Sequence, residues 1–370
     1  MRVLMRLRRP TTLVLTALLP ASLALAACGS DSSDGVKGFD AVSISGQVGE
    51  APKLDWKDTM TAEKAESKVV TKGDGDALKK GDLVRVEFTL ADGWTHQVAY
   101  DSYDDTKLST LVRVGTPKEP QSLTDLLAIG LDGQIKAGQT VGTRIAVAVG
   151  SDVAFGNYFG SQAASLLAGL NIGNEDGMLY VADIVGLAQP QGTAQTAPAW
   201  APKIVEKDGV PTGLDFKGVP AANGELRVAV LTKGEGPAIK DGQQALVNYL
   251  GQLAKGKKPF DESFSKGGFT ATLGGKEASV VKGWSKALVG QTAGSRVILE
   301  IPPKLGYGDK AQGEDIPANS TLYFVIDILD VADPEPKPEP TDTASPSGTP
   351  SGTPSSTGTP SGTPSEGSSN

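Results

Sequence analysis

The sequence predicts an α+β protein of two domains between two polar ends, and three observations lead to this prediction. Apolar runs rich in β-branched residues, such as Arg296 to Ile301 and Leu322 to Leu329, have the pattern of strands. The amphipathic stretch Trp284 to Val289, followed by Gly290, is typical of a short helix with strands on either side. Roughly 280 residues lie between the ends, which is too many for one small α+β unit and enough for two domains.

The first element in chain order is a predicted export signal over residues 1–27. Four arginines precede an apolar run from Leu13 to Ala27, which describes a secretory signal and not a membrane span. The sequence Leu25-Ala26-Ala27-Cys28 resembles a bacterial lipobox, so we expect Cys28 to be lipidated and to anchor the chain to the extracytoplasmic face of the cell membrane. Cys28 is the only cysteine, so the exported chain cannot form an internal disulfide. Residues 28–50 are expected to form a flexible tether.

The balance of charge argues against a nucleic-acid partner. The formal net charge is −8, and residues 1–27 contain four arginines and no acidic residue, so the remaining chain carries −12. Binding to nucleic acid depends on Lys and Arg side chains that neutralise phosphates. An acidic chain of this kind does not provide that surplus.

An internal repeat divides the middle of the chain. Val69 to Gly75 parallels Val230 to Gly236, and Gly138 to Arg144 matches Gly290 to Arg296. We interpret these matches as a tandem duplication, with a first domain at residues 51–188 and a second at residues 205–332. The linker, residues 189–204, is rich in Pro, Ala, Gly and Thr. Two shorter pairs agree with this alignment: Tyr100-Asp101 with Phe260-Asp261, and Ala154-Phe155-Gly156 with Gly306-Tyr307-Gly308.

The second copy carries an ordered set of apolar and aromatic residues. In chain order they are Tyr249, Phe260-Asp261, Phe269, Val280-Val281, Trp284, Tyr307, Ile316 and Phe324. From Leu226 to Val331 this order resembles the FKBP-type peptidyl-prolyl isomerases. The resemblance implies two FKBP-like domains, each a bent antiparallel β-sheet wrapped over a short α-helix. The helix of the second domain would begin near Lys282 to Trp284.

The resemblance also implies a role for each residue of this set. Trp284 would form the floor of a proline pocket, while the Tyr307 hydroxyl and the Val281 N–H would each hold a substrate carbonyl. Asp261 would sit at the rim and accept a hydrogen bond from the Tyr249 hydroxyl or approach the twisting amide. Tyr307, Asp261, Tyr249 and Trp284 are thus the catalytic candidates. The substrate-binding candidates are Phe260, Phe269, Val280, Val281, Ile316 and Phe324.

Isomerisation requires neither a nucleophile nor a cofactor, and no cofactor or metal is expected. His96 is the only histidine, which excludes His-based triads and multi-histidine metal sites. Rotation about an X-Pro bond meets a barrier of about 18–20 kcal/mol because amide resonance must be broken. An apolar pocket favours the twisted amide, whose carbonyl has lost charge separation. The expected substrates are proline-containing unfolded proteins that fold after export, where slow proline steps limit folding.

The first copy lacks this pocket chemistry. Phe88 replaces Tyr249, Leu131 stands in the place of Trp284, Phe155 lacks the hydroxyl of Tyr307, and no Ile-Pro pair is found. We therefore expect little catalysis there and a structural role or a docking surface for client chains.

Two alternatives to the enzyme stay open. Many family members carry a histidine and an apolar residue where this chain has Gln312 and Asp315, and Lys266 is the nearest counterpart of their basic residue after the Phe-Asp pair. A charge beside the pocket is compatible with a non-catalytic client-binding lipoprotein whose prolyl pocket is vestigial. In the other alternative, chaperone activity of the first domain matters more than isomerisation.

The last segment, residues 333–370, consists mainly of Pro, Ser, Gly and Thr. It contains Pro346-Ser347-Gly348-Thr349 and repeats this sequence at Pro350 and Pro360. Such a segment cannot bury enough apolar surface to fold, which predicts disorder. We expect it to extend outward toward a cell wall or to act as a solubilising tail with no partner.

Overall fold

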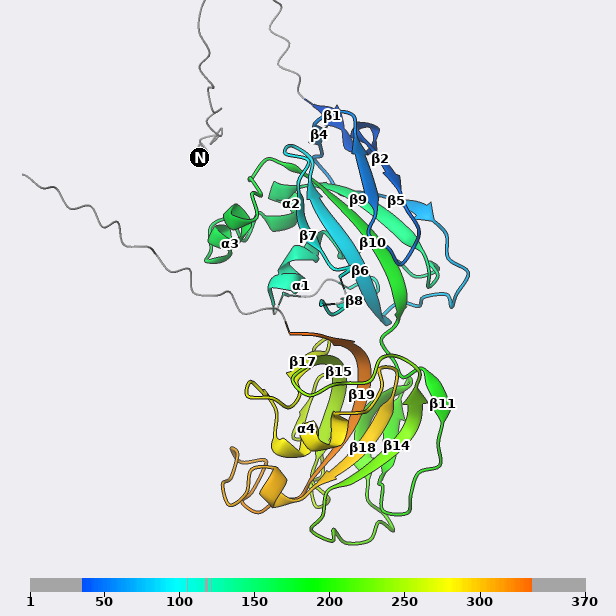
Figure 1. The fold of residues 1–370 in the computed structure, drawn as a ribbon, viewed down its shortest axis with the longest axis vertical. Coiled ribbons are helices and arrows are strands. Elements are labelled where there is room, and N and C mark those ends of the chain that lie inside the picture. Colours follow the sequence, from blue (N-terminus) through cyan, green and yellow to red (C-terminus); the bar gives the residue numbers. More distant parts are fainter. Residues whose placement is uncertain (1–34, 105, 117–118, 121, 335–370) are drawn as a thin grey trace, which may run out of the picture.

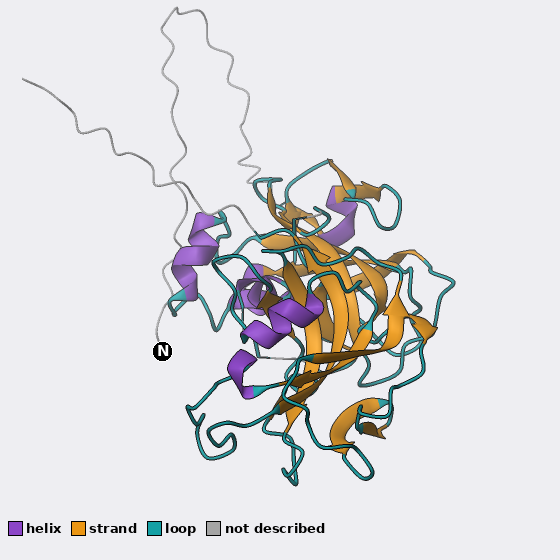
Figure 2. Ribbon diagram, turned by 60° about the horizontal axis from the view of Figure 1, so that its bottom comes forward, coloured by secondary structure: helices purple, strands orange, loops and turns teal. Residues whose placement is uncertain are grey.

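The computed structural model describes residues 35–104, 106–116, 119–120 and 122–334, which are mostly β-structure (Figures 1 and 2). The longest α-helices of the described chain, α3 (Ala163–Gly169) and α4 (Lys282–Leu288), have seven residues each. The described residues are therefore mostly β with few helices, and they contain two large antiparallel sheets. Within the described ranges, no helix has the length and apolar character needed to cross a membrane. The predicted export signal, Cys28 and residues 335–370 lie outside these ranges.

The first large sheet is antiparallel and has the strand order β5-β9-β10-β6-β7, with β8 paired to β6. One face of the sheet and the short helices enclose a core that includes Phe88, Leu131 and Phe155. Most helices lie on one side of the strands in Figure 2. The elements are β5 (Glu66–Thr71), β6 (Leu83–Asp92), β7 (Val98–Asp101), β8 (Thr110–Arg113), α1 (Leu123–Leu127), η2 (Ile129–Leu131), β9 (Arg144–Gly150), α2 (Ser151–Phe155), α3 and β10 (Gly177–Leu187).

The second large sheet has the order β11-β14-β18-β19-β15-β16, with β17 paired to β15. Apart from β11, this is the order of the first sheet, with β14 in the place of β5 and β17 in the place of β8. The elements are β11 (Gly192–Ala194), β14 (Arg227–Gly234), β15 (Gln244–Gln252), β16 (Asp261–Glu262), β17 (Phe269–Thr272), α4, β18 (Arg296–Ile301), η3 (Pro303–Leu305) and β19 (Leu322–Ala332).

Helix α4 packs directly on the second sheet. It begins at Lys282, where the sequence predicted, and its buried face comprises Gly283, Trp284, Ala287 and Leu288. A Cβ atom at Gly283 would lie 2.4 Å from Cγ2 of Ile301 on β18. The absence of a side chain at Gly283 therefore lets the helix approach the strand closely, and this approach places Trp284 against the sheet.

The outer face of each large sheet is covered by a small antiparallel pair of strands. In the first half, β2 (Val42–Ser45) pairs with β3 (Lys53–Trp56), and in the second, β12 (Lys203–Lys207) pairs with β13 (Val210–Asp215). The remaining short elements are β1 (Val36–Lys37), η1 (Gly38–Ala41) and β4 (Met60–Thr61).

Two of the predicted connecting segments are partly folded. Residues 36–45, expected within the tether of residues 28–50, form β1, η1 and β2, because Ala41 and Val42 are buried against the first sheet. In the predicted linker, Gly192 to Ala194 form β11 and pair with Thr232 to Gly234 of β14. Both segments gain backbone hydrogen bonds or apolar burial that composition alone does not reveal.

Each sheet contains a buried ion pair at the same register position. Arg144 Nε lies 2.7 Å from Asp183 Oδ1 in the first sheet, and Arg296 Nε lies 2.6 Å from Asp327 Oδ1 in the second. In both pairs a second guanidinium nitrogen bonds the other carboxylate oxygen, so the contact is bidentate. The aspartate side chains are only 1% exposed, so each carboxylate depends on its arginine.

The two halves meet at a small, specific junction. The backbone N–H and hydroxyl of Ser109 donate to Asp330 Oδ2 at 2.8 and 2.5 Å. Leu111 from the first half forms a buried cluster with Leu246 and Leu329 from the second. These contacts place the end of β8 beside β15 and β19.

Candidate functional site

All ten catalytic and substrate-binding candidates predicted in the second copy line one pocket. Its volume is about 670 Å³, within the usual range of roughly 300–1,000 Å³ for ligand sites. The strands of the second sheet, α4 and the long loop between β18 and β19 each contribute to it. The predicted residues are Tyr249, Phe260, Asp261, Phe269, Val280, Val281, Trp284, Tyr307, Ile316 and Phe324, and the other lining residues are Ala278, Ser279, Gln312 and Asp315.

Aromatic rings in edge-to-face contact form the body of the pocket. The Trp284 ring lies 5.3 Å from Tyr249 at 81° and 5.2 Å from Phe324 at 87°. Phe269 contacts Tyr249 at 5.5 Å, and Phe260 contacts Phe324 at 5.6 Å. Such geometry joins the positive edge of one ring to the negative face of the next. Because Trp284 is only 3% exposed and touches both Tyr249 and Phe324, it holds the base of the pocket in place.

A hydrogen-bonded chain joins the pocket wall to its rim. The Tyr249 hydroxyl donates to Asp261 Oδ2, and Lys266 Nζ donates to Asp261 Oδ1 at 2.8 Å. Burial works to raise the pKa of Asp261, but the hydrogen bonds from Lys266 and Tyr249 hold this pKa below its ordinary value. Burial, and then the hydrogen bond to Asp261, raise the pKa of Tyr249. Asp261 is therefore a carboxylate and Tyr249 a fixed hydroxyl donor at neutral pH.

Two residues that line the pocket carry hydrogen-bond donors with no partner among the described residues. Tyr307 follows η3, and its side chain is 38% exposed. Val281 precedes the first residue of α4, where a backbone N–H has no acceptor within the helix. Both donors are free to bond carbonyl groups of a bound peptide.

The pocket lip carries one charge that is partly compensated. Asp315 is 58% exposed at its side chain and lies 3.9 Å from the Lys258 ammonium group. Next to it, Ile316 is 7% exposed, and its backbone pairs with Gln312 in both directions. The charge therefore lies at the solvent edge, while the apolar Ile316 side chain is directed inward.

Sequence reasoning missed Gly251, which makes room for the aromatic rings. A Cβ atom at Gly251 would lie 2.5 Å from the Phe260 ring and 2.7 Å from the Phe324 ring. Gly251 is paired with Phe324 across β15 and β19. A glycine within a strand often marks a close approach of another group, and this was the signal available in the sequence.

The corresponding place in the first sheet is filled by side chains. Leu90 is paired with Tyr180 across β6 and β10, as Gly251 is paired with Phe324. Leu90, Tyr180, Phe88, Leu131 and Phe155 are all fully buried. Gly130 lies against the Tyr180 ring, so close that a Cβ atom would stand 2.3 Å from it. These residues form a packed core and do not line an open pocket.

Comparison with known proteins places the second half of the chain in a family. Residues 236–329 match the family model of the FKBP-type peptidyl-prolyl cis-trans isomerases. FK506-binding protein 1 of Aspergillus oryzae is 34% identical over 110 residues, which cover 28% of this chain and 94% of that protein. The chain therefore belongs to the FKBP-type peptidyl-prolyl cis-trans isomerases, and residues 236–329 are its isomerase domain.

Longer relatives are matched only in part. The FKBP-type peptidyl-prolyl cis-trans isomerase FkpA of Escherichia coli K12 is 40% identical over 121 residues, which are 33% of this chain and 43% of that protein. The chain thus spans less than half the length of FkpA. The crystal structure of FkpA from Escherichia coli shares 38% identity with a TM-score of 0.28, covering 32% of this chain and 54% of the other.

Proposed function

We propose that the second domain catalyses cis-trans isomerisation of X-Pro bonds in exported or cell-envelope proteins. The observation that supports this most directly is the aromatic pocket over Trp284 with the free donors of Tyr307 and Val281 at its mouth. A proline ring fits an apolar, aromatic-lined pocket of this kind. The two donors hold the flanking carbonyls while the amide between them rotates.

The proposed mechanism is desolvation of the amide combined with fixed donors. The planar amide is stabilised by charge separation that water supports, and the twisted amide has lost this separation. An apolar pocket therefore stabilises the transition state relative to the ground state, as catalysis requires. Lowering the barrier by roughly 5 kcal/mol would accelerate isomerisation several thousandfold.

Isomerisation of short X-Pro peptides by the full chain tests the proposal. We expect turnover that FK506 abolishes, since FK506-binding proteins are among the relatives. Tyr307→Phe keeps the ring and removes one donor, so it should lower turnover more than it lowers peptide affinity. Absence of turnover in the folded parent, or equal loss of turnover and affinity in the variant, would count against an enzyme.

The position of Asp315 in the pocket lining favours the alternative function, a non-catalytic client-binding protein. Its carboxylate lines the pocket and could oppose an apolar residue before proline. The nearby Lys258 reduces this effect, so the enzyme is the better-supported function. Asp315→Ala separates the two, because relief of an inhibitory charge should raise turnover of peptides with an apolar residue before proline.

The first half is best explained as a diverged copy of the second. The matching strand order and ion pairs support this, as does a shared loop contact. In that contact Gly73 N–H donates to Thr143 Oγ1 at 3.0 Å, and Gly234 N–H donates to Ser295 Oγ at 2.9 Å. We propose a structural or client-binding role for it, which its filled core supports. Deleting Gly35 to Gln189 tests a chaperone role, since unchanged protection of an unfolded client from aggregation would exclude it.

The proposed site of action is the extracytoplasmic face of the cell membrane. The support is the lipobox-like sequence ending at Cys28 after an export signal. Cys28→Ser should release the protein from the membrane fraction into the soluble fraction. Persistence of the variant in the membrane would refute a lipid anchor at this residue. We propose that residues 333–370 then contact a cell wall.

A further inference from the structure

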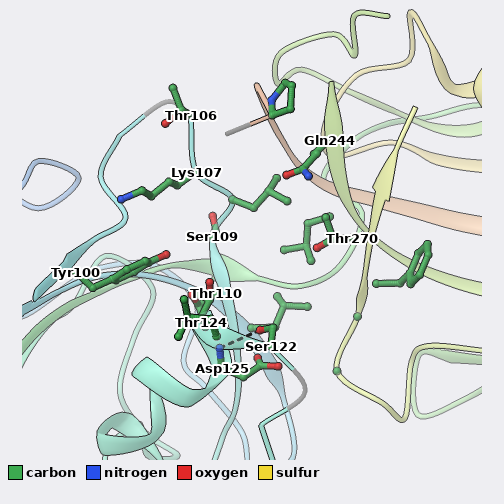
Figure 3. A pocket seen from close by; sticks show the side chains of 18 of the residues that line it. Tyr100, Thr106, Lys107, Ser109, Thr110, Ser122, Thr124, Asp125, Gln244 and Thr270 are labelled. Carbon is green, nitrogen blue, oxygen red and sulfur yellow. Dashed lines mark hydrogen bonds between the residues drawn. The ribbon is translucent and has the colours of Figure 1, made fainter. Parts of the chain in front are cut away.

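A second hollow lies between the two halves of the molecule, next to the prolyl pocket. Its volume is about 770 Å³, and we call it the junction groove (Figure 3). The first half contributes residues around Ser109 and Leu123, and the second contributes residues around Gln244 and Thr270. The Ser109–Asp330 hydrogen bonds and the leucine cluster at the junction fix the two walls relative to each other.

The junction groove adjoins the prolyl pocket at Phe269. Phe269 lines both hollows, and its side chain is 36% exposed between them. Lys266 also lines the groove, while its ammonium group bonds Asp261 of the pocket. A polypeptide that leaves the prolyl pocket past Phe269 therefore reaches the edge of the groove directly.

Strand β17, which lines the groove at Phe269 and Thr270, has a free edge beside it. The N–H of Leu273, the residue directly after β17, donates to the Gln243 carbonyl. Because every second residue of an antiparallel strand bonds the same neighbour, the backbone groups of Leu273, Ala271 and Phe269 all point toward β15. Thr272 points the other way, since its N–H donates to Ser279 Oγ at 3.0 Å. Thr270 must share that outward direction because strand backbone alternates with period two. Within the described chain, no group bonds the outward N–H or C=O of Thr270.

The opposite wall presents an exposed apolar side chain. Leu123, at the first turn of α1, is 45% exposed although it is a large apolar side chain. The hydroxyl of Thr110 is buried and has no hydrogen-bond partner among the described residues. The Lys107 ammonium group is already bonded to the Asp101 carbonyl at 2.6 Å, and Lys266 is bonded to Asp261. The groove thus offers backbone and apolar contacts more than free charge.

We infer that the junction groove binds the extended polypeptide that flanks the proline held in the prolyl pocket. The inference rests on the proposed function, and its argument is that the two hollows adjoin at Phe269, which lines both of them. An extended chain would add to the free edge at Thr270 by backbone hydrogen bonds, a recurring mode of peptide recognition. Its side chains would contact Leu123 across the groove. The first half would then contribute to substrate binding without any catalytic residue of its own.

Peptides of different length test this inference on the full chain. A tetrapeptide with a central X-Pro bond is compared with versions extended on the amino or the carboxyl side by about six residues of Ser, Thr and Leu, roughly 20 Å of extended chain. Isomerisation is followed by exchange NMR. We expect one of the two extensions to lower KM by about tenfold, the effect of about one added hydrogen bond, with kcat unchanged.

Matched variants test whether the groove produces this gain, that is, the lower KM of the extended peptide. Leu123→Ala should remove much of the gain, whereas Leu166→Ala, at a leucine 50% exposed on α3, should not. Thr270→Pro removes the outward N–H, which edge strands tolerate, and should remove the gain, whereas Thr270→Val should keep it. Turnover of the tetrapeptide should be unchanged in all four, which also shows that they are folded.

Each contrary result overturns a different statement. If the tetrapeptide is turned over but neither extension lowers KM in the parent, the groove does not bind the flanking chain. This result is also expected if the chain's own segment 335–370 or a second copy fills the groove. A gain that survives both Leu123→Ala and Thr270→Pro would place the flanking chain elsewhere. Absence of turnover with every peptide would overturn the proposed function and this inference with it.

Discussion

At the scale of single residues, Gly251 decides whether the second sheet can hold a pocket. Its Cα approaches the Phe260 and Phe324 rings so closely that no side chain fits. In the first sheet the same register position carries Leu90, which is fully buried. The difference between an open aromatic pocket and a packed core can therefore begin with one missing side chain on one strand.

We predict that Gly251→Ala lowers turnover of a short X-Pro peptide by at least about tenfold. The new methyl group must displace Phe260 or Phe324, and such overpacking costs about 1–3 kcal/mol. Peptide isomerisation and chemical denaturation measure the two effects. Gly160→Ala is the control, because a Cβ atom there meets no atom within 4 Å. Unchanged turnover in Gly251→Ala would show that the rings can move without loss of the pocket.

A second residue-scale prediction concerns Lys266 and the ionisation of Asp261. The hydrogen bond from Lys266 helps to hold the pKa of Asp261 below its ordinary value, so Lys266→Met should raise that pKa. If the carboxylate form supports turnover, the acid limb of the pH profile then moves to higher pH in the variant. Peptide turnover between about pH 3 and 7 measures this, with the exposed Lys240→Met as control. An acid limb that does not move would separate Asp261 from catalysis.

At the scale of elements, α4 shows why its sequence contains a glycine at the second helical position. Glycine costs roughly 1 kcal/mol in a helix relative to alanine. Here it allows the contact with Ile301 on β18 that seats Trp284 under the pocket. Glycine occurs here despite its local cost because the close packing positions the functional side chain of Trp284.

We predict that Gly283→Ala destabilises the second domain despite the better helix propensity of alanine. The methyl group would overlap the fully buried Ile301, and relief of this overlap should cost about 1–3 kcal/mol in unfolding free energy. Gly169→Ala in α3 is the matched control, since a Cβ atom meets nothing there and the change should be neutral or stabilising. Urea denaturation compares the two. Equal stability of both variants would refute the packing role of Gly283.

The elements also show what the sequence could predict. The resemblance of the aromatic residues to the FKBP family located the pocket, and the glycine-bounded amphipathic stretch located α4, because a short helix depends on local pattern. Packing against the first sheet made Ala41 and Val42 part of a folded unit, and nothing in the local sequence of residues 28–50 signals that partner. The junction groove and the role of Gly251 depend on contacts between distant strands, which neither composition nor periodicity encodes.

At the scale of the whole molecule, the two sheets have separate cores joined by few contacts. The first core and the second core share no residue, and the junction consists mainly of the Ser109–Asp330 bonds and a cluster around Leu111, Leu246 and Leu329. Each half also has its own ion pair, Arg144–Asp183 or Arg296–Asp327, on the outer face of its sheet. Such an arrangement favours two units that unfold separately.

We therefore predict two thermal transitions in calorimetry, each controlled by one ion pair. Arg144→Met leaves Asp183 buried without a partner, which should cost about 3–5 kcal/mol and lower the transition of the first domain by about 10 °C. Arg296→Met should act in the same way on the second domain alone. Peptide turnover identifies the transitions, because Arg144→Met should retain activity up to the unchanged transition, whereas Arg296→Met should lose it at the lowered one. A shift of both transitions in either variant would show instead that the junction couples the two domains into one cooperative unit.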